Sequence, residues 1–198
     1  MPSPFWTKNL VLERLTLEHH RALADFFEEN LEALRASRSD PTKEERGPSD
    51  LAEWEIYNSD FAVAANEGCY YGVWTKAAGR PSRSFIGSMQ VRKRAVSAGG
   101  LHLDVIELGL VLGDAHQRQG YGSECVAAVT HHVLTSRPQE IIGLQIKPDN
   151  EPSLRTARRL GFELLHPLPN ADGTLLFTMS AGSLARMPDR FLGGKGIA

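Results

Sequence analysis

The segment Asp114–Ser123 holds the residues best suited to chemistry, because Gly120 and Gly122 stand one residue apart where a helical pattern begins. Glycine permits unusual backbone angles and lets a ligand approach the main chain closely. The first amides of a helix have no partner inside the helix and carry partial positive charge. Such a turn can bind a phosphate-sized anion, and Arg118 would add a formal positive charge.

The two glycines alone leave several interpretations open. A plain strand-to-helix turn fits the pattern about as well as a binding site does. A dinucleotide-binding loop of the G-x-G-x-x-G type would need a third glycine where Cys125 stands. A Walker A loop would need G-K-[ST], whereas the chain has Gly122-Ser123-Glu124. Both nucleotide-binding loops are therefore disfavoured.

The hydrophobic pattern predicts the elements that position this segment. Period-two and β-rich stretches indicate seven strands, at residues 10–15, 70–74, 85–91, 103–112, 141–146, 162–165 and 175–179. Helical spacing and capping signals indicate four helices, at residues 17–36, 51–65, 122–136 and 153–160. This order predicts an α/β (α+β) fold with a mixed, mostly antiparallel sheet, in which residues 114–123 join a strand to a helix.

Three motifs in order resemble one family. Gln117-Arg118-Gln119-Gly120-Tyr121-Gly122 fits the [RQ]-x-x-G-x-[GA] motif of GNAT acetyltransferases, and Glu107–Leu112 resembles the strand that precedes it. Farther on, Asn150–Ser153 and Arg159–Phe162 resemble the N-x-x-[SA] and L-G-F end of the family. The chain looks most like the Rim-type branch, which acetylates the N-termini of ribosomal proteins.

The resemblance implies a GNAT fold in which the family's fourth and fifth strands splay apart. It implies a single domain over residues 1–198, with a core at about 10–180 and a C-terminal tail at 181–198. The implied activity is transfer of the acetyl group of acetyl-CoA to a primary amine, such as a protein N-terminus, without a metal. Two alternatives stay open: acetylation of a small amine such as an antibiotic or polyamine, and a non-catalytic CoA-binding sensor.

The same resemblance implies where the cofactor binds. Main-chain groups of the fourth strand would hold the pantetheine arm, the loop amides would hold the pyrophosphate while Gln117 braces the turn, and Asn150 would contact the cofactor near the splay. The implied residues are Leu110, Val111, Leu112, Gln117, Arg118, Gln119, Gly120, Tyr121, Gly122, Ser123 and Asn150. A simple helix cap is the structural alternative for Asn150, and both roles can coexist.

Two catalytic positions depart from the family. Gln145 stands where some relatives have a glutamate base, and Ala157 stands where many have a tyrosine acid. Glu107 is the candidate base, since its apolar neighbours would desolvate it and raise its pKa; a solvated position on the sheet is the alternative. Ser153 would assist the leaving thiolate or serve only as a first-turn helix residue. A main-chain amide near Val111 or Leu112 would stabilise the oxyanion.

The resemblance also implies that the acceptor site borders the first two helices and the loop at residues 37–50. Acidic residues there would suit a cationic amine, although such a run is also typical of a solvated surface. Nearby aromatic residues could line a pocket or belong to the core. The acidic residues are Asp40, Glu44, Glu45, Asp50, Glu53 and Glu55. The aromatic residues are Trp54, Tyr57, Tyr70, Tyr71 and Trp74.

Composition disfavours several other classes of protein. A net charge of −2 over 198 residues disfavours broad nucleic-acid binding. The two cysteines, Cys69 and Cys125, are far apart and lack CxxC spacing, so they are expected to be reduced thiols. Neither is expected to be a nucleophile, because acetyl transfer in the family that the chain resembles is direct. No histidine pair has metal-ligand spacing. The chain reads as cytoplasmic, without a signal peptide or membrane span, and a homodimer is possible by family resemblance.

Overall fold

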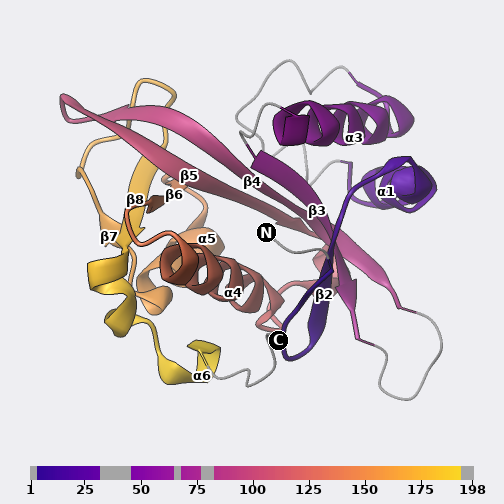
Figure 1. The fold of residues 1–198 in the computed structure, drawn as a ribbon. Coiled ribbons are helices and arrows are strands. Elements are labelled where there is room, and N and C mark those ends of the chain that lie inside the picture. The colour runs from indigo at the N-terminus through magenta and orange to yellow at the C-terminus, as the bar shows by residue number, and fades with distance from the viewer. Residues whose placement is uncertain (1–3, 32–45, 65–67, 77–82, 193–198) are drawn as a thin grey trace. The chain divides into compact units, whose positions relative to one another are not determined.

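The computed structural model describes residues 4–31, 46–64, 68–76 and 83–192 (Figure 1). It contains two compact units. One comprises residues 91–109 and 122–198, and the other comprises residues 2–90 and 110–121. The strands β4 and β5 belong to both units, which are described separately below.

The sheet has eight strands in the order β1-β2-β3-β4-β5-β6-β8-β7. Recorded pairings are antiparallel for β1–β2, β2–β3, β6–β8 and β7–β8, and parallel for β5–β6, so the prediction of a mixed, mostly antiparallel sheet is confirmed. The strands are β1 Phe5–Trp6, β2 Leu10–Arg14, β3 Gly68–Thr75, β4 Phe85–Ala98, β5 Leu101–Leu112, β6 Ile141–Ile146, β7 Glu163–Leu164 and β8 Leu175–Ser180.

All seven expected strands are present, and the two-residue strand β1 is additional. It lies between prolines and a turn, and two residues are too few to show a period-two pattern. Its residues Phe5 and Trp6 pair with Leu12 and Val11 of β2.

The helices also follow the expected order. They are α1 His20–Glu29, α3 Pro48–Ala64, α4 Tyr121–Ser136, α5 Glu151–Leu160 and α6 Asp189–Leu192, with 3₁₀ turns η1 Leu17–His19, η3 Asp114–His116 and η4 Ala181–Arg186. The first helix was expected to reach Ala36, but α1 ends at Glu29. There the Asn30 side chain donates to the Phe26 carbonyl oxygen at 2.8 Å and closes the helix. Residues 32–45, including most of the expected loop, lie outside the described residues.

In the unit of residues 2–90 and 110–121, α1 and α3 pack side by side, and α3 packs against β3 (Figure 1). Helix α1 contributes Leu23, Phe26 and Phe27, because these residues recur at helical spacing on one face. Val111 of β5 packs against the same cluster. The end of β5 is thereby joined to the apolar core under α1.

In the unit of residues 91–109 and 122–198, β6 pairs with β8 along its whole length, from Ile141–Ser180 to Ile146–Leu175. On its other edge β6 pairs with β5 at only two positions, Ile106–Ile142 and Glu107–Gly143. The parallel ladder therefore ends early in β6, as the expected splay of these two strands requires.

The expected C-terminal tail is structured as far as Leu192. Met187 is 1% exposed, and a side chain at Gly161, the residue that ends α5 with φ of 87°, would meet Arg186. The tail thus packs against the end of α5, and residues 193–198 lie outside the described residues.

Gly87 marks a close backbone approach that predicts a stability effect. A Cβ atom there would clash with the Val111 carbonyl oxygen, and a backbone atom cannot move aside as a side chain can. We expect Gly87→Ala to lower the free energy of unfolding by about 2–3 kcal/mol, the upper range for overpacking. Urea denaturation followed by tryptophan fluorescence measures this.

Gly182→Ala is the matched control, since the nearest atom to its added Cβ is 3.8 Å away. Its unfolding midpoint should equal that of the wild type. Equal midpoints for both variants would show that β4 and β5 are not as close at Gly87 as the structure places them.

Candidate functional site

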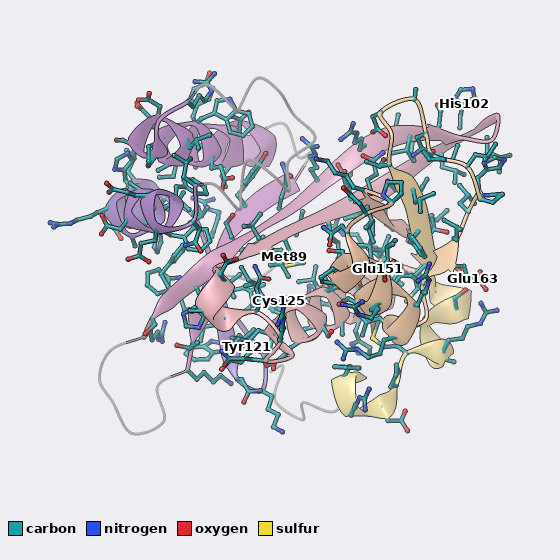
Figure 2. The ribbon with its side chains drawn as sticks, turned by 180° about the vertical axis from the view of Figure 1, so that it is seen from behind. Met89, His102, Tyr121, Cys125, Glu151 and Glu163 are labelled. Carbon is teal, nitrogen blue, oxygen red and sulfur yellow. The ribbon has the colours of Figure 1, made fainter. Side chains whose placement is uncertain are left out.

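The candidate site is the connection from β5 to α4. Strand β5 ends at Leu112, the 3₁₀ turn η3 follows at Asp114–His116, and α4 begins at Tyr121. Figure 2 shows Tyr121 and Cys125 one turn apart at the start of this helix. The segment between them and β5 is the glycine-bearing loop that the sequence singles out.

Side chains brace this loop from within. The amide nitrogen Nε2 of Gln117 donates to the Leu112 carbonyl oxygen at 3.1 Å and to Asp114 Oδ1 at 2.9 Å. The Nε2 of Gln119 donates to the Ala115 carbonyl oxygen at 2.8 Å. These bonds hold the loop without using the main-chain amides that follow Gln117.

The backbone takes left-handed angles at two loop positions. Gly120 has φ of 88°, and Arg118 has φ of 59°, which is the one positive φ among the described non-glycine residues. Such a conformation costs about 1–3 kcal/mol outside glycine and is concentrated at ligand-binding turns. Alternation of left- and right-handed residues also turns successive amides toward one side, forming an anion-binding concavity.

The main-chain amides from Arg118 to Ser123 donate to no protein acceptor within the described part of the chain. A Cβ atom on Gly120 would meet no atom within 4 Å, so open space adjoins the backbone there. Unpaired amides, a helix N-terminus and free space form a donor set that fits a diphosphate. This fit supports acetyl-CoA as the group held by the loop.

The three strand residues expected at the pantetheine arm differ in their surroundings. Val111 is half-buried and packs against the cluster under α1, while the Leu112 carbonyl oxygen already accepts from Gln117. A carbonyl oxygen has two lone pairs, so Leu112 retains one acceptor position. Leu110 is half-buried as well.

Asn150 caps α5. Its Oδ1 accepts from the Ser153 main-chain amide at 3.2 Å, which is the structural role weighed for it from the sequence. That bond fixes the side-chain plane, and Nδ2 has no acceptor among the described residues. Ser153 is half-buried, and its hydroxyl likewise has no recorded partner in the described chain.

Glu107 is 8% exposed, but its carboxylate is not isolated. Arg92 Nε donates to Oε2 at 2.9 Å, and an Arg94 guanidinium nitrogen donates to the same oxygen at 3.2 Å. The sequence predicted burial among apolar neighbours and did not foresee the two cations, which face Glu107 from β4. These ion pairs give Glu107 a structural role, and its role as a base stays a prediction.

Both cysteines are reduced thiols in the structure. Cys125 is completely buried on α4, and burial raises the pKa of its thiol. Burial also raises the pKa of Cys69. Since the thiolate is the reactive form, neither residue is suited to be a nucleophile.

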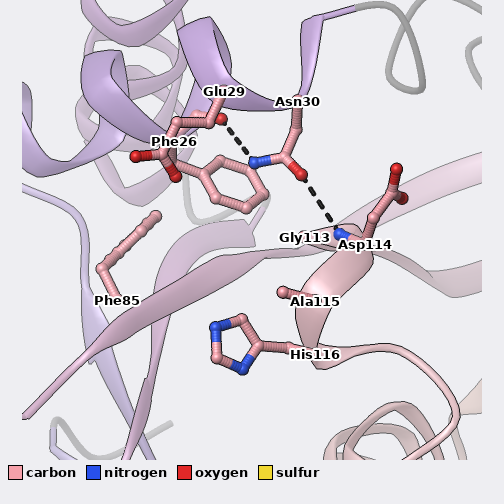
Figure 3. A pocket seen from close by; sticks show the side chains of 8 residues that line it. All are labelled: Phe26, Glu29, Asn30, Phe85, Gly113, Asp114, Ala115 and His116. Atoms are coloured by element: carbon pink, nitrogen blue, oxygen red, sulfur yellow. Dashed lines mark hydrogen bonds between the residues drawn. The ribbon is translucent and has the colours of Figure 1, made fainter.

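A pocket of about 280 Å³ lies beside the loop, within the unit of residues 2–90 and 110–121 (Figure 3). The rings of Phe26 and Phe85 meet edge to face at 5.5 Å on one side of it, and His116 lies opposite. Asn30 Oδ1 accepts from the Asp114 amide at 3.1 Å, which ties α1 to η3. The remaining lining residues are Glu29, Gly113 and Ala115.

Sequence reasoning missed this pocket's residues. His116 and Asp114 adjoin the motif, which was a usable signal, but nothing in the pattern connects them to Glu29 or Asn30 of α1. Of the acceptor residues expected instead, Tyr70 and Tyr71 are 4% and 1% exposed and belong to the core, while Tyr57 is 69% exposed. Asp50, Glu53, Trp54 and Tyr57 line a second cavity on α3, and Asp40, Glu44 and Glu45 lie outside the described residues.

The described residues contain no group of three histidine, cysteine or carboxylate side chains arranged to hold a metal ion. No helix among them has the length and apolar character to cross a bilayer.

Comparison with known proteins identifies the family. Residues 9–163 match the model of the acetyltransferase (GNAT) domain. The chain belongs to the GNAT acetyltransferase family and is an acetyl-CoA-dependent N-acetyltransferase. A comparison with curated proteins finds no significant match in sequence.

Solved structures share the fold at low identity. They include RimJ of Mycobacterium smegmatis in complex with CoA-disulfide (13% identity, TM-score 0.71, covering 96% of this chain and 94% of that one). The ribosomal-protein-S5-alanine acetyltransferase of Vibrio fischeri shows 16% identity, TM-score 0.67 and coverage of 89% and 96%. The Salmonella typhimurium acetyl transferase that modifies the N-terminal serine of ribosomal protein L7/L12 shows 15% identity and a TM-score of 0.67. The match covers 88% of this chain and 96% of that one.

The first turn of α4 generates a binding prediction. Gly122→Glu places a carboxylate among the unpaired amides, where it satisfies them and repels phosphate. At about 4 Å and an effective dielectric constant of about 20, two unit charges repel by about 4 kcal/mol. We expect CoA affinity to fall roughly 1000-fold in isothermal titration calorimetry, with an unchanged circular dichroism spectrum.

Gly182→Glu, which adds the same charge outside the loop, should bind CoA as the wild type does. Retained affinity in Gly122→Glu would refute the assignment of the loop as the phosphate site.

Proposed function

We propose that this chain acetylates the N-terminal amine of a protein or peptide. The support is family membership, together with fold neighbours whose named substrates are ribosomal-protein N-termini. The observation that carries the acetyl-CoA half of the proposal is the row of unpaired amides from Arg118 to Ser123. Bound acetyl-CoA supplies an acetyl group activated as a thioester.

The chain's own residues hold that co-substrate by complementary hydrogen bonding. The amides from Arg118 to Ser123 bind the pyrophosphate, and Gln117 keeps the turn in shape through Leu112 and Asp114. Main-chain groups of Leu110–Leu112 bond the amide-rich arm as an added strand would. In the unit of residues 91–109 and 122–198, the cap on Ser153 orients Asn150, whose Nδ2 is the further donor that the family resemblance implies for the cofactor.

The proposed chemistry requires a proton path and charge stabilisation. A main-chain amide at Val111 or Leu112 donates to the thioester oxygen as negative charge develops there. The attacking amine must lose a proton, for which Glu107 or a water chain is the acceptor, and the Ser153 hydroxyl donates to the departing sulfur. The ion pairs of Glu107 with Arg92 and Arg94 favour the water chain, because they already occupy the carboxylate.

The pocket beside η3 suits a cationic acceptor. Glu29 forms no ion pair among the described residues, and the Phe26 and Phe85 rings offer apolar and π surfaces to an alkyl ammonium group. A volume of about 280 Å³ accommodates one amino-acid side chain or a chain terminus. We assign the pocket to the acceptor because it adjoins the strand segment proposed to hold the pantetheine arm.

An acceptor panel tests the proposed function. Peptides with free N-termini, polyamines and aminoglycosides are each incubated with acetyl-CoA, and released CoA thiol is measured. We expect turnover on peptides, with mass spectrometry placing the acetyl group on the α-amine. Turnover on small amines alone would replace the proposal with a small-amine acetyltransferase, and CoA binding without any turnover would indicate a sensor.

Glu29→Gln tests the acceptor pocket. Removing an exposed carboxylate costs about 0.2–1 kcal/mol of ion pairing, so KM for a peptide that begins with a basic residue should rise about two- to fivefold. The kcat value and the Kd for acetyl-CoA should not change, because the proposal places Glu29 in contact with the acceptor and not with acetyl-CoA or the reacting atoms.

Glu28→Gln, the neighbouring exposed residue that does not line the pocket, is the control. Identical KM values for both variants, over peptides with acidic and basic first residues, would remove Glu29 from the acceptor site.

A further inference from the structure

A cluster of positive charge stands at the N-terminal end of α4, within the unit of residues 91–109 and 122–198. Arg159 of α5 donates a hydrogen bond from its guanidinium group to the Ser123 hydroxyl in the first turn of α4. Ser123 is 2% exposed, so this bond ties the guanidinium to a fixed point on the helix. Arg159 is itself exposed and open to a ligand.

A second arginine joins Arg159 on one aromatic ring. The guanidinium carbon of Arg159 lies 5.9 Å from the centre of the Phe191 ring, and that of Arg190 lies 5.0 Å from it. Phe191 belongs to α6 in the C-terminal tail, which therefore contributes both a ring and a cation to the cluster. A planar guanidinium that rests on a ring keeps its N–H groups free at the edge.

The cluster presents two exposed cations. Arg159 stands in the last turn of α5, where the helix dipole favours a cation, and its guanidinium group also contacts the first turn of α4. Neither arginine forms an ion pair with a carboxylate in the part of the chain that the structure describes. Arg155 and Arg186, by contrast, pair with Glu151 and Glu163. The unpaired cluster thus has the charge of a phosphate-binding site.

We propose that Arg159, supported by Arg190, binds the 3′-phosphate of the CoA ribose and makes the enzyme select CoA over 3′-dephospho-CoA. This inference rests on the proposed placement of the pyrophosphate at the first turn of α4. The 3′-phosphate is a terminal dianion on the nucleotide end of the same molecule. Guanidinium groups bind such groups through two parallel, charge-assisted hydrogen bonds.

The cluster also gives the C-terminal tail a function. Phe191 and Arg190 reach the cofactor only if α6 keeps its place, so the tail acts as part of the binding site. The loop motif in the sequence does not reveal this role of the tail. Arg159 and Ser123 are more than 30 positions apart in the chain, and α6 has only four residues.

Calorimetric titration of Arg159→Gln with CoA and with 3′-dephospho-CoA tests the proposal. We expect the Kd for CoA to rise about 10- to 100-fold, the range for one lost charge-assisted contact, while the Kd for 3′-dephospho-CoA changes less than about twofold. Arg159→Lys should keep part of the preference, since it retains the charge and loses the two-point geometry. Arg190→Gln should weaken CoA binding in the same selective way by a smaller factor.

Arg158→Gln is the matched control, because Arg158 is an exposed neighbour on α5 whose side chain has no recorded contact in the described residues. Its Kd values should equal those of the wild type. Equal losses with both ligands in Arg159→Gln would overturn the proposal and make Arg159 a pyrophosphate or positioning residue. No loss with either ligand would also overturn it, whereas failure of the wild type to bind CoA at all would refute the proposed function first.

Discussion

The proposed function depends on one set of hydrogen-bond donors, the main-chain amides from Arg118 to Ser123. Within the described residues, no protein acceptor is available to them, and the loop is braced through side chains that leave them unused. A left-handed Arg118 costs free energy that no recorded protein contact of that residue repays. An anionic ligand at this loop, as proposed, would supply acceptors to these amides and offset the cost of the left-handed Arg118.

The scaffold around the loop explains how such a turn is held in place. Gly87 allows β4 to approach the Val111 carbonyl oxygen, and Val111 packs against the apolar cluster beneath α1. Asn30 then connects the end of α1 to η3 through the Asp114 amide. The strand end, the first helix and the start of the loop thus form one packed assembly, which limits movement where the reacting group is proposed to lie.

Each unit carries a charged feature of its own. In the unit of residues 91–109 and 122–198, Arg159 and Arg190 at Phe191 are proposed to bind a phosphate. In the unit of residues 2–90 and 110–121, the pocket with Glu29 is proposed to bind an ammonium group. The ligands of an N-acetyltransferase differ in the same way, since the co-substrate is a polyanion and the acceptor is an amine. Glu107 lies outside this division, because two arginines of β4 neutralise it.

The order of the elements and the position of the loop were determined by the sequence itself. Strand and helix periodicity depend on neighbouring residues, and the loop motif is contiguous, so both are visible locally. The eight-stranded sheet differs from expectation mainly by a strand of two residues, which is too short for a period. The end of α1 at Asn30 also escaped prediction, because it depends on one side chain turning back onto Phe26.

Only the tertiary structure decided which charges meet. Glu107 appeared as an isolated carboxylate in an apolar strand, yet Arg92 and Arg94 of the adjacent strand reach it, since strand pairing joins residues that are 13 to 15 positions apart. Arg159 lies 36 positions from Ser123, and Glu29 and His116 reach the same pocket from segments still farther apart. Electrostatic partners are set by distance in space, and no local pattern encodes that distance, so the chemistry of this site could be located but not completed from the sequence.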